Sequence, residues 1–143
     1  GYRFDYRGRS VVISGDSNVT GSTRRIAANT DLLLPDALSQ PVMKKLSESA
    51  SQAGLSRMSK IMDDVLDYHA STTSLVKLGS EVDIAMVAFY HLVPVPANVI
   101  VEQFFLRDLP ENFVLADDGD WFALPADSDE IKITTNGILN TFQ

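Results

Sequence analysis

The feature that most constrains the fold is an unbroken apolar run at residues 84–89, which reads Ile-Ala-Met-Val-Ala-Phe. A strand with apolar residues at successive positions has to bury both of its faces, and such strands are typical of parallel sheets covered by other layers. The run leads into Tyr90 and His91 at its carboxyl end, where open α/β sheets usually bind their ligands. We therefore expect the functional site at that edge of the sheet.

Two further apolar runs, at residues 11–13 and 32–34, predict neighbouring strands of the same sheet. At the start of the chain, aromatic and charged residues alternate over residues 2–6, which is the period of a half-buried strand. A tight turn at residues 7–9 follows, so we expect an antiparallel hairpin. Further short strands are expected in the tail, at residues 113–116, 121–124 and 130–134.

Apolar residues at helical spacing predict helices between these strands. A helix from Val42 should end before Gly54, because glycine commonly follows the last helical residue. The next helix should be capped by Ser56, and its apolar stripe is expected to be buried; the stripe consists of Met58, Ile61, Met62, Val65 and Leu66. Other helices are expected at residues 23–29, from Ser71 or Thr72 to about Gly79, and at residues 97–107.

These elements predict an α/β (α+β) fold with one mixed β-sheet and helices on one face. We expect a single domain over residues 1–134 and a flexible tail over residues 135–143. The central strands need cover on both faces, and the predicted helices suffice for only one of them. The second face is therefore expected to pack against a second copy or against a layer that this chain lacks.

Composition excludes several functions. The net charge is −7, with no stripe of Lys and Arg that could follow a phosphate backbone, so we expect no nucleic-acid partner. The chain contains no cysteine, which excludes disulfides, thiolate metal sites and a cysteine nucleophile. No apolar run approaches the roughly 20 residues that a membrane span needs, so no membrane association is expected.

Only two histidines occur, His69 and His91, and each lies between a predicted regular element and a loop. An isolated histidine beside apolar residues is more often a hydrogen-bonded core or edge residue than a metal ligand. Asp16, which follows the strand at 11–13, could equally form a turn or bind a metal. The paired carboxylates elsewhere suit solvent-exposed helix faces and hairpin turns, and we assign them no catalysis.

Taken in order, however, the motifs resemble the C-terminal half of the metallo-β-lactamase-fold hydrolases, in the ribonuclease Z/arylsulfatase-like branch. The resemblance covers residues 1 to about 133, and it is carried by Ser-Val-Val-Ile-Ser-Gly-Asp (10–16), Asp-Leu-Leu-Leu (31–34), Asp-Tyr-His (67–69) and Tyr-His-Leu-Val-Pro (90–94). It implies half of an αββα sandwich. By this resemblance, Asp16 would bridge two metal ions and His91 would bind the second. His69, which lies 22 residues before His91, would stabilise an oxyanion or protonate the leaving group.

The metal implied by the resemblance is Zn²⁺, Fe or Mn, and a metal-bound hydroxide would hydrolyse an ester, lactone, phosphodiester or sulfate ester. This chain departs from the family pattern in three places. Nothing matches the His-x-His-x-Asp-His motif, residues 35–37 read Pro-Asp-Ala instead of His-Glu-Ala, and the segment after His69 lacks the usual glutamate. Since metal sites normally need three or four protein donors, we expect little or no metal on the isolated chain.

Two hypotheses follow. The chain is a fragment or truncated member of a metal-dependent hydrolase, inactive alone and acting on a small-molecule substrate when completed by an N-terminal half-domain. Alternatively, it is a non-catalytic half-domain that forms a homodimer through the uncovered face of its sheet.

Overall fold

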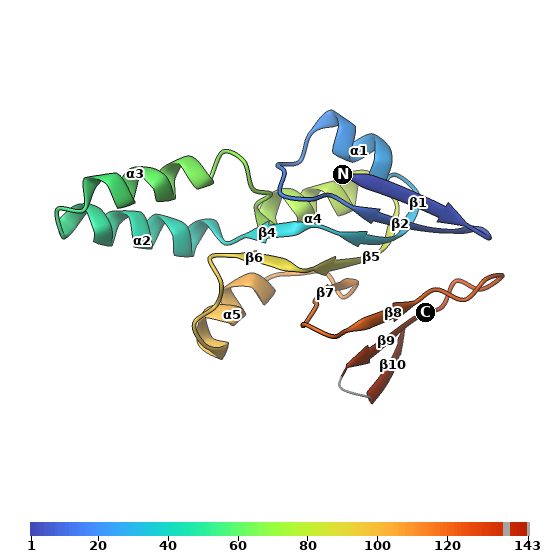
Figure 1. Ribbon diagram of the computed structural model, residues 1–143. Helices are drawn as coiled ribbons and strands as arrows, with labels where there is room; N and C mark the ends of the chain where they lie inside the picture. Colours follow the sequence, from blue (N-terminus) through green and yellow to red (C-terminus); the bar gives the residue numbers. More distant parts are fainter. Residues whose placement is uncertain (136–137, 143) are drawn as a thin grey trace.

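The computed structural model describes residues 1–135 and 138–142, with side chains described up to residue 134. The fold is mixed α/β, as predicted (Figure 1). In chain order the described elements are β1 (Tyr2–Tyr6), β2 (Arg9–Ile13), α1 (Gly21–Ala27), β3 (Thr30–Leu34), β4 (Asp36–Leu38), α2 (Gln40–Gln52), α3 (Ser56–Val65), α4 (Thr72–Glu81), β5 (Ile84–Phe89), β6 (His91–Val93), α5 (Val99–Leu106), β7 (Phe113–Leu115), β8 (Trp121–Ala123), β9 (Ile131–Thr135) and β10 (Ile138–Phe142).

The main sheet has five strands in the order β1-β2-β3-β5-β7. Strands β1 and β2 form the expected antiparallel hairpin, and the other neighbours pair in parallel. The apolar run at residues 84–89 is β5, which lies between β3 and β7, and its Val87, Ala88 and Phe89 have no exposed surface. The prediction of a central strand buried on both faces is confirmed.

Helices α1 and α4 cover one face of this sheet. Alternate strand residues, such as Val12, Leu33 and Val87, pack there in one buried cluster with Leu75 and Leu78 of α4. This cluster also contains Ala27 of α1 and Phe105 of α5. The predicted helices therefore cover one face of the main sheet, as expected from the spacing of their apolar residues.

The other face is covered in part by a second, three-stranded antiparallel sheet in the order β10-β9-β8 (Figure 1). Leu32, Met86 and Ala88 of the main sheet pack there against Ile131 and Ile133 of β9. The expectation that this face depends wholly on another chain or layer is therefore wrong, because the tail strands fold back over it. Strand β10 lies where the sequence predicts a flexible tail and pairs with β9; residues 136, 137 and 143 lie outside the described residues.

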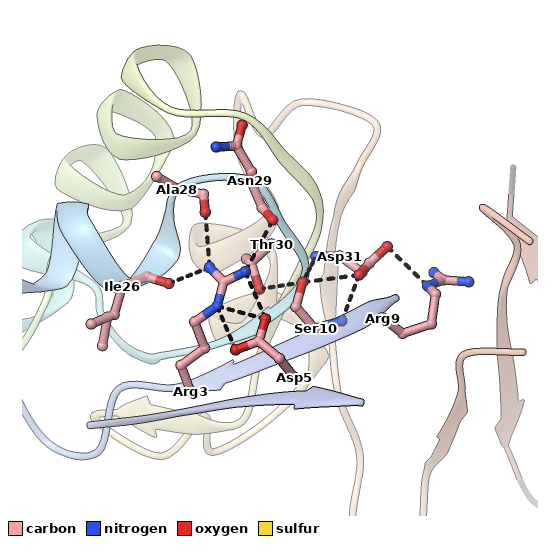
Figure 2. Close-up of polar contacts among 9 residues, drawn as sticks. All are labelled: Arg3, Asp5, Arg9, Ser10, Ile26, Ala28, Asn29, Thr30 and Asp31. Atoms are coloured by element: carbon pink, nitrogen blue, oxygen red, sulfur yellow. Dashed lines mark hydrogen bonds and ion pairs between the residues drawn. The ribbon is translucent and has the colours of Figure 1, made fainter. Parts of the chain in front are cut away.

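Figure 2 shows a cluster of polar contacts, here called the Arg9 cluster, which consists of Arg9, Ser10 and Asp31. Through Arg9 this cluster also joins the main sheet to the smaller one. The Asp31 carboxylate accepts hydrogen bonds from Arg9 Nε at 3.0 Å and from the Ser10 backbone N–H at 2.6 Å. Nη1 of Arg9 donates to carbonyl oxygens between β8 and β9: those of Pro125, Ser128 and Glu130. The guanidinium group therefore holds the smaller sheet against β2 and β3.

Helices α2 and α3 form a hairpin that projects beyond the sheet, on the left in Figure 1. Helix α3 begins at Ser56 with Leu55 in the capping position, so the predicted Ser56 cap is wrong. The predicted burial of its stripe is also wrong for the outer residues, because Met58 is 48% and Ile61 46% exposed. At that distance from the sheet, α3 packs mainly against α2, which in turn contacts α5.

Helix α5 leaves several of its apolar residues exposed. Of its residues only Phe105 is buried, whereas Val99 and Ile100 are largely exposed and Phe104 partly so. Within the described ranges, none of the helices has the length and apolar character to cross a membrane.

Candidate functional site

The candidate site lies at the carboxyl edge of the main sheet, where β2, β3 and β5 end. Asp16 lies in the turn after β2. Strands β3 and β5 each continue, after one residue, into a short strand, β4 and β6, and these two pair in parallel with Asp36 opposite His91. The β4–β6 pair therefore brings two chain segments that are 55 positions apart in sequence to one place, and His69 packs beside them.

A buried carboxylate fixes the position of His69. Oδ2 of Asp36 lies 2.7 Å from Nδ1 of His69 and also accepts the backbone N–H of Ala70 at 3.2 Å. Oδ1 accepts the backbone N–H of Ser17 at 3.4 Å. Asp36 has no exposed surface, and His69 is almost completely buried. Because Nδ1 is held by Asp36, Nε2 is the ring nitrogen that remains for chemistry.

Burial raises the pKa of Asp36, because removal from water disfavours the ionised carboxylate. The hydrogen bonds from His69, Ala70 and Ser17 oppose this effect but do not outweigh it. When Asp36 is ionised, Nδ1 carries the shared proton, and Nε2 can accept or carry a second one. The Asp36–His69 pair is thus suited to moving a proton at Nε2.

Asp16 and His91 form the exposed side of the site. Oδ2 of Asp16 lies 3.9 Å from Nε2 of His91. The His91 ring lies beside that of His69, with 5.7 Å between the ring centroids. The three residues singled out in the sequence, at positions 16, 69 and 91, therefore lie together in the fold, although their chemical roles remain predictions.

Asp36 is the residue that sequence reasoning missed. The available signal was a carboxylate directly after a buried strand, in the place where the family pattern His-Glu-Ala has its glutamate. The segment departs from that pattern at Pro35, which cannot bind a metal through its side chain. A three-residue strand such as β4 is also too short to be recognised from its periodicity.

The residues present fit a metal ion only in part. Two ligands each about 2.1 Å from one ion lie roughly 3 to 4 Å apart, and the 3.9 Å between Asp16 and His91 falls in that range. Among the residues whose positions are described, however, no group of three or more His, Asp or Glu side chains is arranged to hold a metal. Nδ1 of His69 is occupied by Asp36. Two donors therefore form an incomplete site.

A hollow of about 560 Å³ adjoins His91. Tyr90, Val95 and Pro96 contribute to one part of its lining, and Asp117 and Asp118 to another. Partial burial raises the pKa of Tyr90, and the nearby Asp16 and Asp36 carboxylates add to that effect. The Tyr90 phenol thus keeps its proton and can donate a hydrogen bond beside the site.

No protein-family model matches this chain, and no curated protein matches it in sequence.

Proposed function

We propose that this chain carries half of a hydrolytic metal site of the metallo-β-lactamase-fold type. In this proposal Asp16 and His91 are two of the metal ligands, and an N-terminal half-domain supplies the others. The observation that supports it most is the convergence of Asp16, His69 and His91 from distant parts of the sequence, with the buried Asp36 holding His69 at 2.7 Å.

His69 is proposed to act as the general acid of the intact enzyme. Its Nε2 faces away from Asp36 and can deliver a proton to a leaving-group oxygen, while Asp36 fixes the orientation of the ring. Asp36 is a positioning residue, because it would touch His69 and not the substrate. The hydrolysed bond would be that of an ester, lactone, phosphodiester or sulfate ester, and the net charge of −7 favours a small substrate over RNA.

The two histidines permit a direct test. Each imidazole Hε1 signal in an NMR spectrum can be assigned by a single substitution, because the chain contains no other histidine. During titration with Zn²⁺ we expect the His91 signal to shift and the His69 signal to move little. The expected affinity is weak, because only two donors are present.

Matched variants make the result specific. Asp16→Asn and His91→Gln should each weaken Zn²⁺ binding by about tenfold or more, whereas His69→Gln should leave it nearly unchanged. The proposal fails if neither histidine signal responds at millimolar Zn²⁺, or if the loss of His69 weakens binding as much as the loss of His91.

A further inference from the structure

The projecting α2–α3 hairpin carries an apolar stripe on its outer side. Leu55, Met58 and Ile61 are spaced three residues apart, so they lie along one side of α3, and each is about half exposed. The same residues line a shallow hollow at the start of α3. Three neighbouring large apolar side chains at the end of a projecting helix are unusual on a surface that remains in water, and such a stripe indicates a partner.

The charges beside this stripe change sign at the middle of α3. Arg57 and Lys60 precede Ile61, and Asp63 and Asp64 follow it. Arg57 and Asp64 are seven residues apart, so both lie on the same side of the stripe. Asp64 pairs with Lys60 at 2.8 Å, whereas Arg57 is in no ion pair within the part of the chain that the structure describes.

We propose that a second copy of this chain binds to the α2–α3 hairpin, with the two α3 helices antiparallel about a two-fold axis near Ile61. In that arrangement Arg57 reaches the partner's Asp64, and the partner's Arg57 reaches Asp64. A two-fold interface requires one surface to be complementary to itself, and α3 meets this requirement with basic residues in its first half and acidic residues in its second. A helix with one sign of charge throughout would repel its own copy.

The expected dimer is weak. The stripe from Leu55 to Ile61 is about 9 Å long at 1.5 Å per residue, which places the interface at the small end of specific protein contacts. Association should therefore depend on concentration in the micromolar range or above. The surface is separate from the sheet face considered from the sequence, and the inference does not depend on metal binding. It does bear on the site, because the hairpin connects Asp36 to His69 along the chain.

Sedimentation equilibrium of the full chain, from low micromolar to near millimolar concentration, tests the proposal. We expect the wild type to dimerise and Ile61→Asp to weaken the dimer by at least about tenfold, because a charge would be buried at its centre. Ile100→Asp is the matched control, since Ile100 is a 72% exposed isoleucine on α5. A wild type that stays monomeric at the highest concentration overturns the proposal, as does a dimer that Ile100→Asp dissociates and Ile61→Asp does not.

Charge reversal tests the antiparallel geometry. Arg57→Glu and Asp64→Arg should each weaken self-association, because each variant places like charges together at both ends of the interface. A mixture of the two variants should restore a dimer that contains one copy of each, since both ion pairs are then complementary again. Arg107→Glu, at an exposed arginine that ends α5, controls for net charge and should have no effect. If the mixture associates no better than either variant alone, the proposed pairing is wrong.

Discussion

Two acidic residues, Asp31 in β3 of the main sheet and Asp36 in the short strand β4 that follows it, each hold a cationic or titratable partner, yet their surroundings differ. In the Arg9 cluster, Asp31 binds Arg9 and Ser10, and Arg9 reaches carbonyl groups of the second sheet. In the site, Asp36 holds only one ring nitrogen of His69. The first arrangement joins parts of the fold, whereas the second leaves Nε2 for a reacting group.

The two pairs also lie at opposite ends of the strands. Arg9 and Asp31 lie at or next to the first residues of β2 and β3, and Asp36 lies beyond the carboxyl end of β3. Ligands of open α/β sheets bind at the carboxyl ends of the strands. The comparison thus predicts that the amino-end cluster determines stability and that the carboxyl-end residues can change with little loss of stability.

The largest expected effect is that of Arg9→Met. Removal of the guanidinium, which is 8% exposed, leaves Asp31 and the carbonyl groups of the β8–β9 connection without their cation. Loss of one partner of a buried ion pair costs about 3 to 5 kcal/mol. We expect a loss of this size in the free energy of unfolding, measured by urea denaturation and circular dichroism.

Arg24→Met is the control for this prediction. Arg24 pairs with Glu81 at 2.7 Å, but both side chains are more than a third exposed. Solvent-exposed ion pairs contribute about 1 kcal/mol or less, so this variant should remain close to the wild type. Equal losses for Arg9→Met and Arg24→Met would remove the distinction between the Arg9 cluster and an ordinary surface pair.

The sequence predicted the main sheet well because its strands carry their signal locally. The apolar run of β5 and the alternation of β1 require no knowledge of what lies opposite. Helical periodicity likewise revealed the stripe on α3, but a stripe records which side is apolar and not whether anything covers it. Met58 and Ile61 were therefore predicted to be buried, although the hairpin projects away from the core.

The remaining features depend on contacts between distant residues. The second face is covered because Ile131 and Ile133 of β9 pack on the main sheet. The sequence of these short tail strands does not indicate on which surface they pack. The site shows the same limit. Motif order identified Asp16, His69 and His91, whereas the hydrogen bond between Asp36 and His69 joins residues 33 positions apart, and the sequence does not show which residue the Asp36 carboxylate meets.

A second prediction concerns how stability depends on pH at Asp36. Its pKa is raised in the folded protein, so the folded state keeps a proton that the unfolded chain releases. This contribution to stability is complete below the ordinary aspartate pKa, at about 4, and is lost as the pH rises through the raised value. As the pH rises between the ordinary and the raised pKa, the free energy of unfolding of the wild type should fall relative to that of Asp36→Asn. The expected fall is on the order of 1 kcal/mol for each pH unit.

Urea denaturation of both proteins at a series of pH values measures this difference, and the titrating groups that do not contact Asp36 cancel in the comparison. If the wild type instead gains stability over Asp36→Asn as the pH rises, then the hydrogen bonds from His69, Ala70 and Ser17 outweigh burial. Asp36 would then be a carboxylate held in its charged form by its hydrogen bonds.

The smallest effect on stability is expected at the two proposed metal ligands. Asp16 and His91 are exposed, and the 3.9 Å between them is too long for a hydrogen bond, so neither side chain contributes much to the fold. Asp16→Asn and His91→Gln should each change the free energy of unfolding by less than about 0.5 kcal/mol, measured by urea denaturation without added metal. A loss above about 2 kcal/mol in either variant would make that residue structural and would end the contrast between the two ends of the sheet. A small loss combined with weaker Zn²⁺ binding is the behaviour of residues whose side chains serve a ligand and not the fold.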